Sequence, residues 1–200
     1  MDPINKISYG LYVLSANDGE KVNGCIINTA CQVASKPEMI SVSVNKSGLT
    51  HDMVAASGKF CVSVLSEETP FSVFKHFGFS SGRDTQKFFP TEGMEFGWTE
   101  DGLPYLKSTA NAYIEAAVTQ KIDLGSHTLF IGEVIEKQNL SDVNSATYSY
   151  YHSHIKPKKK PVASKGWVCK ICGYIYEGEE LPADFTCPIC KHPASDFEKL

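Results

Sequence analysis

Two pairs of cysteines near the end of the chain have the spacing of a metal site. Cys169 and Cys172 form one C-x-x-C pair, and Cys187 and Cys190 form a second pair further along. Four thiolates brought to one point bind either zinc or iron in tetrahedral geometry. Zinc would make the tail structural, whereas iron would make it a one-electron carrier. The spacing therefore predicts a metal-binding segment over residues 166–200.

The tail is too short to fold on its apolar surface alone, so we expect the metal to supply part of its stability. Gly173 directly follows Cys172 and permits a left-handed turn. Such a turn aims backbone N–H groups at the thiolates and stabilises their negative charge. Pro188 stiffens the second turn because its ring fixes the backbone φ angle.

A second group of residues has the composition of a ring and phosphate cradle. Small and polar side chains on a strand, such as the run from Asn28 to Cys31, let a flat ring lie close to the backbone. Ser47 and Thr50 flank the start of a predicted helix, and a helix N-terminus suits a phosphate. An ordinary barrel strand with small residues explains the same pattern. No G-x-G-x-x-G run is present, which argues against a Rossmann nicotinamide domain.

The elements that must position these residues are mostly strands. Alternating or β-rich runs predict strands at 7–16, 22–34, 39–44, 60–65, 112–124 and 127–138. Short helices are expected at 48–56, with Ser47 as its cap, at 71–77 and at 146–152. Gly125-Ser126 forms a short link between the last two strands. Many strands with a few short helices predict a mainly β fold with a closed barrel.

Charge and composition divide the chain into three parts. Residues 1–155 carry a net charge of −6, residues 156–165 carry +5, and residues 166–200 carry −3. Prolines and lysines in the middle part cannot build a core, so we expect an extended linker between two domains. An acidic body and an acidic tail argue against nucleic-acid binding.

The sequence also bears on compartment and membrane. No apolar run approaches the roughly 20 residues that span a bilayer, so no membrane segment is expected. The run from Met1 to Lys6 lacks the basic start and apolar stretch of a secretory leader. We therefore expect the protein in the cytoplasm, where thiols stay reduced and C-x-x-C pairs tend to bind metals.

The residues around the cysteines resemble rubredoxin. The resemblance rests on the run WVCKICGYIY at 167–176, on the CPIC run at 187–190 and on Phe197. The stretch between the pairs is shorter than in free-standing rubredoxins and is similar to the form found at the C-terminus of rubrerythrins. The resemblance implies one iron bound by Cys169, Cys172, Cys187 and Cys190. It also implies a small aromatic core made of Trp167, Tyr174, Tyr176 and Phe197.

Residues 5–150 resemble the flavin reductase-like family, the FMN-binding split barrels. The resemblance rests on Asn23-Gly24 and the strand after it, on SSGRDTQKF at 80–88 and on GSHTLFIGEV at 125–134. It implies FMN held near its ring and ribityl chain by Asn28, Thr29, Ala30 and Cys31. Asn45, Ser47 and Thr50 would bind the FMN phosphate. Arg83 and Lys87 would contact a phosphate of either nucleotide. His127 would lie near the flavin or the nicotinamide.

Other roles stay open for several of these residues. His127 can be a hydrogen-bonded barrel residue, and Arg83 and Lys87 can pair with surface carboxylates. Cys25, Cys31 and Cys61 fit buried apolar thiols better than ligands or nucleophiles.

The combined chain resembles the high-molecular-weight rubredoxins. That resemblance implies electron transfer from NADH or NADPH through bound FMN to an iron centre with four cysteine ligands. By analogy, the final protein acceptor is a flavodiiron protein that reduces nitric oxide or dioxygen. The family pairs two barrels, which implies a homodimer. Two alternatives remain, namely a flavin reductase with a structural zinc tail and a flavin-binding adaptor without turnover.

Overall fold

The computed structural model describes residues 3–89, 91, 93–157 and 166–200. The chain divides into two compact units, Met1–Lys156 and Pro157–Leu200. Residues 158–165, most of the expected linker, lie outside the described residues. Among the described helices, none combines the length and the apolar character that crossing a membrane requires.

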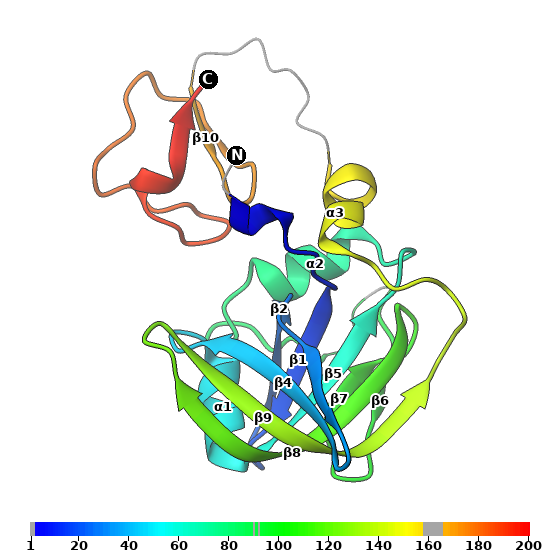
Figure 1. Ribbon diagram of the computed structural model, residues 1–200. Coiled ribbons are helices and arrows are strands. Elements are labelled where there is room, and N and C mark those ends of the chain that lie inside the picture. The colour runs from blue at the N-terminus through cyan, green and yellow to red at the C-terminus, as the bar shows by residue number, and fades with distance from the viewer. Residues whose placement is uncertain (1–2, 90, 92, 158–165) are drawn as a thin grey trace. The chain divides into compact units, whose positions relative to one another are not determined.

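The first unit is mainly β, as its strand-rich sequence predicts (Figure 1). Its strands are β1 (Tyr12–Asn17), β2 (Val22–Ile27), β3 (Cys31–Ser35), β4 (Glu38–Asn45), β5 (Lys59–Leu65), β6 (Phe96–Trp98), β7 (Pro104–Leu106), β8 (Ala110–Asp123) and β9 (His127–Asn139). Its helices are α1 (Leu49–Ser57), α2 (Phe71–Gly78) and α3 (Tyr148–Tyr150). A 3-10 turn at Pro3–Lys6 and a π-helical turn at Tyr151–Ile155 complete the unit.

Seven of these strands form one antiparallel sheet in the order β2-β1-β5-β8-β9-β4-β3. The two edge strands, β2 and β3, are neighbours in sequence and are separated by residues 28–30 alone. Because so short a link cannot cross a flat seven-stranded sheet, the sheet must curl until its edges meet. The result is a barrel that is split between β2 and β3. We predicted one strand over 22–34, and the structure corrects this to two strands on opposite edges.

The long β8–β9 hairpin curves across the barrel in Figure 1. Its turn uses Gly125 at a φ of 79°, which favours glycine, and Leu124 N–H donates to His127 O at 2.9 Å. Gly132 on β9 is tightly packed, because a Cβ there would lie 3.0 Å from the Ala117 carbonyl oxygen. Gly132 of the 125–134 motif therefore allows close packing between β8 and β9.

The barrel core is filled from the strands and from one helix. Met53 and Val54 of α1 are buried against Val42 of β4 and Phe130 of β9. Helix α1 ends at Gly58, which has a φ of 70° and donates to Val54 O. The prediction of Ser47 as the helix cap is wrong. Gly48 holds the cap position without a side-chain hydrogen bond.

The ends of the first unit differ more from prediction. Helix α3 is shorter than the expected 146–152 and continues as the π-helical turn, with Thr147 Oγ1 accepting from Tyr150 N–H at 3.1 Å. The β6–β7 hairpin was not expected and covers a small outer core of Cys61, Leu103 and Tyr113.

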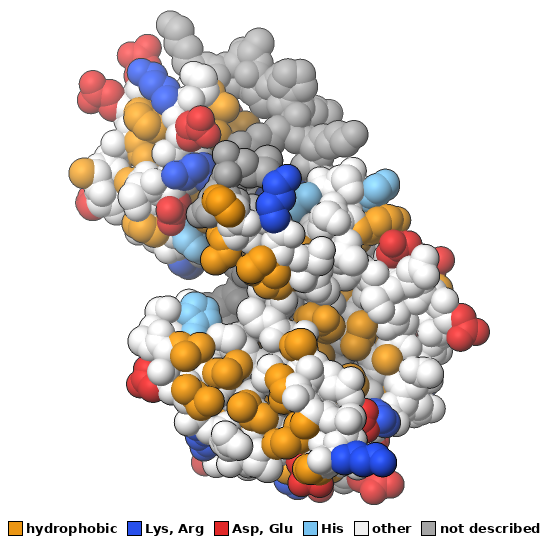
Figure 2. Space-filling model, viewed as in Figure 1, with side chains coloured by type: hydrophobic (Ala, Val, Ile, Leu, Met, Phe, Trp, Pro, Cys, Tyr) orange, Lys and Arg blue, Asp and Glu red, His pale blue; other side chains and the backbone are white. Residues whose placement is uncertain are grey.

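Figure 2 shows apolar side chains gathered on the barrel face that bears β4 and β9.

Glu115 of β8 is fully buried beside that outer core. Neither of its carboxylate oxygens has a hydrogen-bond partner among the described residues. Across the sheet it lies opposite Cys61 of β5 and Glu136 of β9. Burial first, and then the charges of Asp101 and Glu136, raise the pKa of Glu115 to about 7. The fold therefore favours the protonated carboxyl group.

We expect Glu115→Gln to weaken the pH dependence of stability. An acid whose pKa rises on folding from 4.5 to about 7 stabilises the fold fully below pH 4.5. That contribution, at most about 3 kcal/mol, is lost as the pH rises to about 7. Between pH 5 and pH 8, the unfolding free energy of the wild type should fall by about 1 to 3 kcal/mol more than that of the variant in urea titrations.

The exposed Glu133 of β9 provides a matched control. Glu133→Gln should retain the wild-type slope of stability against pH. Equal slopes for wild type and Glu115→Gln would show that Glu115 titrates normally in the folded state.

The second unit contains a three-stranded sheet in the order β11-β10-β12. Its elements are β10 (Trp167–Cys169), β11 (Ile175–Tyr176), β12 (Phe197–Lys199) and a 3-10 turn at Ala194–Asp196. An aromatic cluster packs beside the cysteines, namely Trp167, Tyr174, Tyr176, Phe185 and Phe197. Phe185 was not anticipated, yet its ring centroid lies 4.7 Å from Tyr176 and 5.4 Å from Phe197. The remaining members confirm the predicted aromatic core.

Candidate functional site

The four predicted metal ligands converge in the second unit. The sulfur atoms of Cys169, Cys172, Cys187 and Cys190 all lie within 4.8 Å of one another. Cys169 Sγ is 3.6 Å from Cys190 Sγ, and Cys172 Sγ is 3.5 Å from Cys187 Sγ. Metal–sulfur bonds of about 2.3 Å in a tetrahedron put sulfurs roughly 3.8 Å apart. The donor set therefore fits one tetrahedral metal ion bound by four thiolates.

Two similar backbone turns hold the four sulfurs. In the first turn, Cys169 N–H donates to Tyr174 O at 2.8 Å and Gly173 N–H donates to Cys169 O at 2.9 Å. In the second turn, Cys187 N–H donates to His192 O and Lys191 N–H donates to Cys187 O at the same distances. Gly173 and its counterpart Lys191 both have positive φ angles, of 81° and 61°. A lysine in this conformation is unfavourable, which indicates that the turn imposes it.

Backbone N–H groups favour one thiolate of the cluster, whereas burial disfavours another. Burial alone would raise the pKa of Cys187, but the backbone N–H groups of Cys190 and Ile189 hydrogen-bond its sulfur and lower it. Burial raises the pKa of Cys172 to about 11. A metal ion replaces the protons of such thiols and compensates the charge of the thiolates. The predicted aim of backbone N–H groups at a thiolate is present at Cys187.

The first unit has a cavity at the split of the barrel, which we call the split cavity. Its volume is about 250 Å³. It is lined by the end of β2 and the link after it, by β4, by the start of α1 and by the start of β9. The lining residues are Cys25, Ile26, Ile27, Asn28, Thr29, Ser43, Val44, Asn45, Ser47, Gly48, Thr50, His51 and His127. At the split, β2 is an edge strand that pairs with β1 alone among the described strands.

Short hydrogen bonds fix the polar wall of the split cavity. Thr29 Oγ1 donates to Ser43 O at 2.9 Å and accepts from Ser43 N–H, which ties the β2–β3 link to β4. Asn45 Oδ1 accepts from both the N–H and the hydroxyl of Ser47 at 2.9 Å. This bond explains why Ser47 does not cap α1. The first turn of α1 therefore lacks a side-chain cap, which leaves its N-terminus available to an anion.

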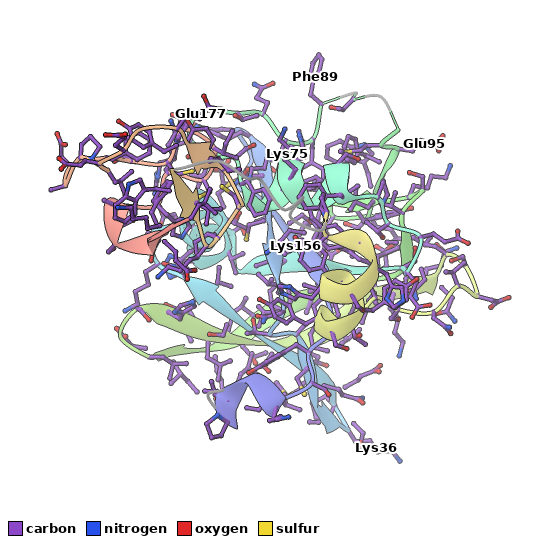
Figure 3. The ribbon with its side chains drawn as sticks, turned by 90° about the horizontal axis from the view of Figure 1, so that it is seen from above. Lys36, Lys75, Phe89, Glu95, Lys156 and Glu177 are labelled. Carbon is purple, nitrogen blue, oxygen red and sulfur yellow. The ribbon has the colours of Figure 1, made fainter. Side chains whose placement is uncertain are left out.

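A second cavity of about 230 Å³, here the loop cavity, adjoins the first. The two cavities share Cys25, Ser47, Gly48 and Thr50. The loop cavity is closed by residues 79–89, the Gly-Arg loop, which contributes Arg83 and Lys87. Figure 3 shows the side chain of Phe89, at the end of this loop, pointing away from the barrel. The loop cavity is also lined by Gly48 and Leu49, so the loop covers one side of the α1 N-terminus.

Lys87 anchors the Gly-Arg loop with a buried charge. Only 3% of the residue is exposed, and Nζ donates to Gly24 O and Phe77 O, both at 3.0 Å. Burial lowers the pKa of Lys87, and no carboxylate pairs with it among the described residues. A buried cation without a counter-ion is costly, so the loop cavity is suited to an anion.

A buried amide also indicates that the loop cavity binds a ligand. Asn23 Nδ2 donates to Thr50 Oγ1 at 3.0 Å, while Asn23 Oδ1 is buried and has no hydrogen-bond partner among the described residues. Gly82 of the loop packs on this amide so closely that a Cβ would lie 2.2 Å from Nδ2. The polar atoms, the uncapped helix and Lys87 together fit the ring and phosphate ends of a flavin nucleotide.

The structure brings most of the predicted flavin residues to these cavities. Asn28, Thr29, Asn45, Ser47, Thr50 and His127 line the split cavity, and Arg83 and Lys87 line the loop cavity. Ala30 and Cys31 line neither cavity. Ala30 packs against the barrel core, and the exposed Cys31 directs its thiol to Gln32 O. His127 Nδ1 lies 2.9 Å from Ser126 Oγ.

Three residues of the site were not identified from the sequence. Cys25 was interpreted as a core thiol, yet it lines both cavities, and burial raises its pKa. Asn23 supplies the unpartnered oxygen described above. His51 stands in the first turn of α1 and faces the split cavity. The position of His51 next to Thr50 was the one signal in the sequence that pointed to it.

Comparisons with known proteins agree with both sites. Residues 4–159 match the flavin reductase like domain, and residues 167–198 match the rubrerythrin, rubredoxin-like domain. A high molecular weight rubredoxin from Moorella thermoacetica is 37% identical over 98% of both chains. A ferric-chelate reductase (NAD(P)H) from Archaeoglobus fulgidus is 40% identical over 80% of this chain and 92% of its own.

A solved structure shares the fold of the first unit. An NADH:FAD oxidoreductase from Streptomyces globisporus superposes with a TM-score of 0.65, covers 74% of this chain and 85% of its own, and is 24% identical. The four-cysteine cluster and the matched domains identify an electron-transfer protein that combines flavin and rubredoxin chemistry. The chain belongs to the flavin reductase-like family and carries a rubredoxin-like domain at its C-terminal end.

Proposed function

We propose that this protein takes electrons from NADH or NADPH, passes them through FMN to an iron centre with four cysteine ligands, and delivers them to a protein acceptor. The chain is an NAD(P)H-dependent oxidoreductase. The observation that carries the proposal is the presence, in one chain, of a flavin reductase domain and four sulfurs spaced for one metal. A flavin accepts two electrons at once and an iron site carries one, so the pair converts hydride transfer into single-electron delivery.

The cavities support FMN as the flavin. The ring would lie in the split cavity against Asn28, Thr29 and His127, with Ala30 at the end of the β2–β3 link and Cys31 at the start of β3. The phosphate would lie at the start of α1, near Asn45, Ser47 and Thr50, with Arg83 and Lys87 of the loop cavity as its charged partners. A terminal phosphate suits the uncapped helix and the buried ammonium.

The rubredoxin-like match of the second unit supports iron as the metal, and the surface of the unit indicates where the acceptor docks. Cys169 and Cys187 are buried, whereas Cys172 and Cys190 are partly exposed. Ile171 and Ile189, at equivalent places in the two turns, are 38% and 39% exposed. An apolar surface beside the exposed sulfurs suits short-lived docking and short electron-transfer distances. By family analogy the acceptor is a flavodiiron protein that reduces nitric oxide or dioxygen.

We expect Ile189→Glu to slow delivery to the acceptor about ten-fold while leaving the visible spectrum of the iron centre unchanged. The charge replaces apolar contact in the docking surface without touching a sulfur. Stopped-flow oxidation of the reduced chain by its acceptor measures the rate. Ala183→Glu adds the same charge at another exposed position of the unit and serves as control. Equal rates for Ile189→Glu and wild type would place docking elsewhere.

Two further features belong to the proposal. Val33, Ile122, Leu124 and Ile135 are exposed apolar side chains of the barrel, and the apolar face in Figure 2 supports pairing of two barrels as a homodimer. Sedimentation of the full chain tests this point. None of the seven cysteines forms a disulfide, which supports a reducing compartment, the cytoplasm.

Metal and flavin analysis of the purified chain, paired with its absorption spectrum, tests the proposal. One FMN and one iron per chain are expected, with absorption bands of both centres. Zinc in place of iron would favour a flavin reductase with a structural tail. Anaerobic mixing with NADH, and separately with NADPH, tests turnover and shows which nucleotide is used. A flavin that neither nucleotide bleaches would favour a binding adaptor.

A further inference from the structure

Four side chains form a continuous hydrogen-bonded chain that links a residue lining the split cavity to a residue lining the loop cavity. His51 Nε2 lies 2.9 Å from Thr128 Oγ1 on β9, and His51 Nδ1 lies 3.1 Å from Asp52 Oδ1. Asp52 Oδ2 accepts a hydrogen bond of 2.8 Å from Arg83 Nη2. His51 lines the split cavity and Arg83 lines the loop cavity. Asp52 therefore joins a group in one cavity to a group in the other.

The Asp52 carboxylate interacts with two partners of different kinds, an imidazole and a guanidinium. Hydrogen bonds from His51 first, and then from Arg83, lower the pKa of Asp52, so its carboxylate form is stable. Arg83 is always charged, whereas the imidazole is charged only when both of its nitrogens carry protons. If Arg83 turns to another anion, the charge of Asp52 acts on His51 alone. A carboxylate without another partner favours the charged imidazole beside it.

The loop cavity offers Arg83 such an anion site. Its wall combines the uncapped N-terminus of α1 with the buried ammonium of Lys87, and both features attract phosphate. We propose that Asp52 is a shared counter-ion that transmits phosphate binding at Arg83 to His51, leaving a charged imidazole at the wall of the split cavity. This inference rests on the proposed function. It connects the phosphate end of the ligand to the environment of its ring.

A charged His51 has a consequence for the reaction. A positive charge fixed at the cavity wall stabilises a ring that gains electrons, because charge developing in a cavity responds to preorganised groups nearby. The chain would thus favour reduction of a phosphorylated flavin over the same ring without phosphate. His51 is a positioning residue in this scheme, held between Thr128 and Asp52.

The surroundings of His51 determine which effects must be separated. The titratable and charged groups near it are Asp52 on its own helix, Arg83 and Lys87 of the Gly-Arg loop, Cys25 of β2, Lys121 and Asp123 of β8, and His127 of β9. Strand β9 also presents Thr128 and Phe130, whose ring centroid lies 5.6 Å from that of His51. A bound phosphate could also act on His51 directly through space, so the test must distinguish that field from the path through Asp52.

The test uses the 15N chemical shifts of the His51 ring in the full-length chain at pH 7. These shifts report which ring nitrogens carry protons, and His51→Gln assigns the signals. The fraction of doubly protonated rings should rise about three-fold on addition of FMN, the change expected from removing one nearby charge at high dielectric. Riboflavin, which has the same ring without the phosphate, should leave the fraction unchanged.

Two variants isolate the role of Asp52. Arg83→Gln should show the raised fraction before any ligand is added, because Asp52 then has His51 as its partner. Asp52→Asn should show no rise with FMN. Lys59→Gln removes a cation that pairs with Asp101 elsewhere on the barrel and should behave as wild type.

Each contrary result has a defined meaning. A rise that persists in Asp52→Asn would show a direct field of the phosphate and overturn the shared counter-ion. An equal rise with riboflavin, or no change in Arg83→Gln, would overturn it as well. If neither flavin binds, the proposed function fails, and the Arg83→Gln spectrum without ligand still decides the inference. FMN binding without any response of His51 would overturn the inference alone.

Discussion

A Cys187→Ser variant is expected to lose the iron centre and, with it, electron delivery to the acceptor. The buried Cys187 is one of four sulfurs within 4.8 Å of one another. A tetrathiolate metal contributes about 10 kcal/mol or more of apparent binding free energy, which a unit of this size needs to fold. The visible bands of the iron site should vanish, and delivery should fall at least about 100-fold.

Flavin reduction by NAD(P)H should survive in the same variant, because the first unit has its own core and its own cavities. Pro188→Ala lies in the same turn, keeps all four sulfurs and should retain the iron spectrum. Delivery that persists in Cys187→Ser would show that electrons leave from the flavin directly. The relay through the second unit would then be wrong.

A Lys87→Gln variant is expected to bind FMN about 10 to 100 times more weakly. The substitution removes a buried charge whose hydrogen bonds hold the Gly-Arg loop to β2 and α2. A hydrogen bond from this ammonium to the FMN phosphate would contribute about 1.5 to 3 kcal/mol, which corresponds to this range of affinity. Fluorescence titration with FMN and with riboflavin measures the loss, and it should be smaller for riboflavin.

Lys75→Gln removes an exposed lysine of α2 that Figure 3 labels and should leave FMN affinity within about two-fold of wild type. Thermal unfolding of both variants separates a weaker site from a loosened fold. Equal losses for FMN and riboflavin in Lys87→Gln would show that the lysine supports the loop without attracting the phosphate.

Local chemistry made several elements predictable. Spacing alone predicted the four cysteines as metal ligands, and their sulfurs converge in the structure. The β8–β9 hairpin followed from two β-rich runs and Gly125, and the end of α1 followed from Gly58. In each case, a few residues that are neighbours in the sequence determine the local structure.

The elements that prediction missed depend on distant parts of the chain. The break at residues 28–30 is set by the sheet order, which places β2 and β3 on opposite edges, while their sequence reads as one continuous run. His51 reaches the split cavity because α1 docks on the barrel with Met53 and Val54 inward. Lys191 takes a left-handed conformation that only the second cysteine turn explains. Glu115 is polar in sequence and buried in the fold.

The most direct test follows both centres during a single turnover. The full-length chain is mixed anaerobically with one equivalent of NADH, or of NADPH, and absorbance is recorded at the flavin and iron bands. The account predicts that the flavin bleaches first and that the iron bands bleach afterwards, at the rate at which the reduced flavin gives up one of its two electrons. Iron bands that stay unchanged while the flavin remains reduced would contradict electron transfer between the two centres.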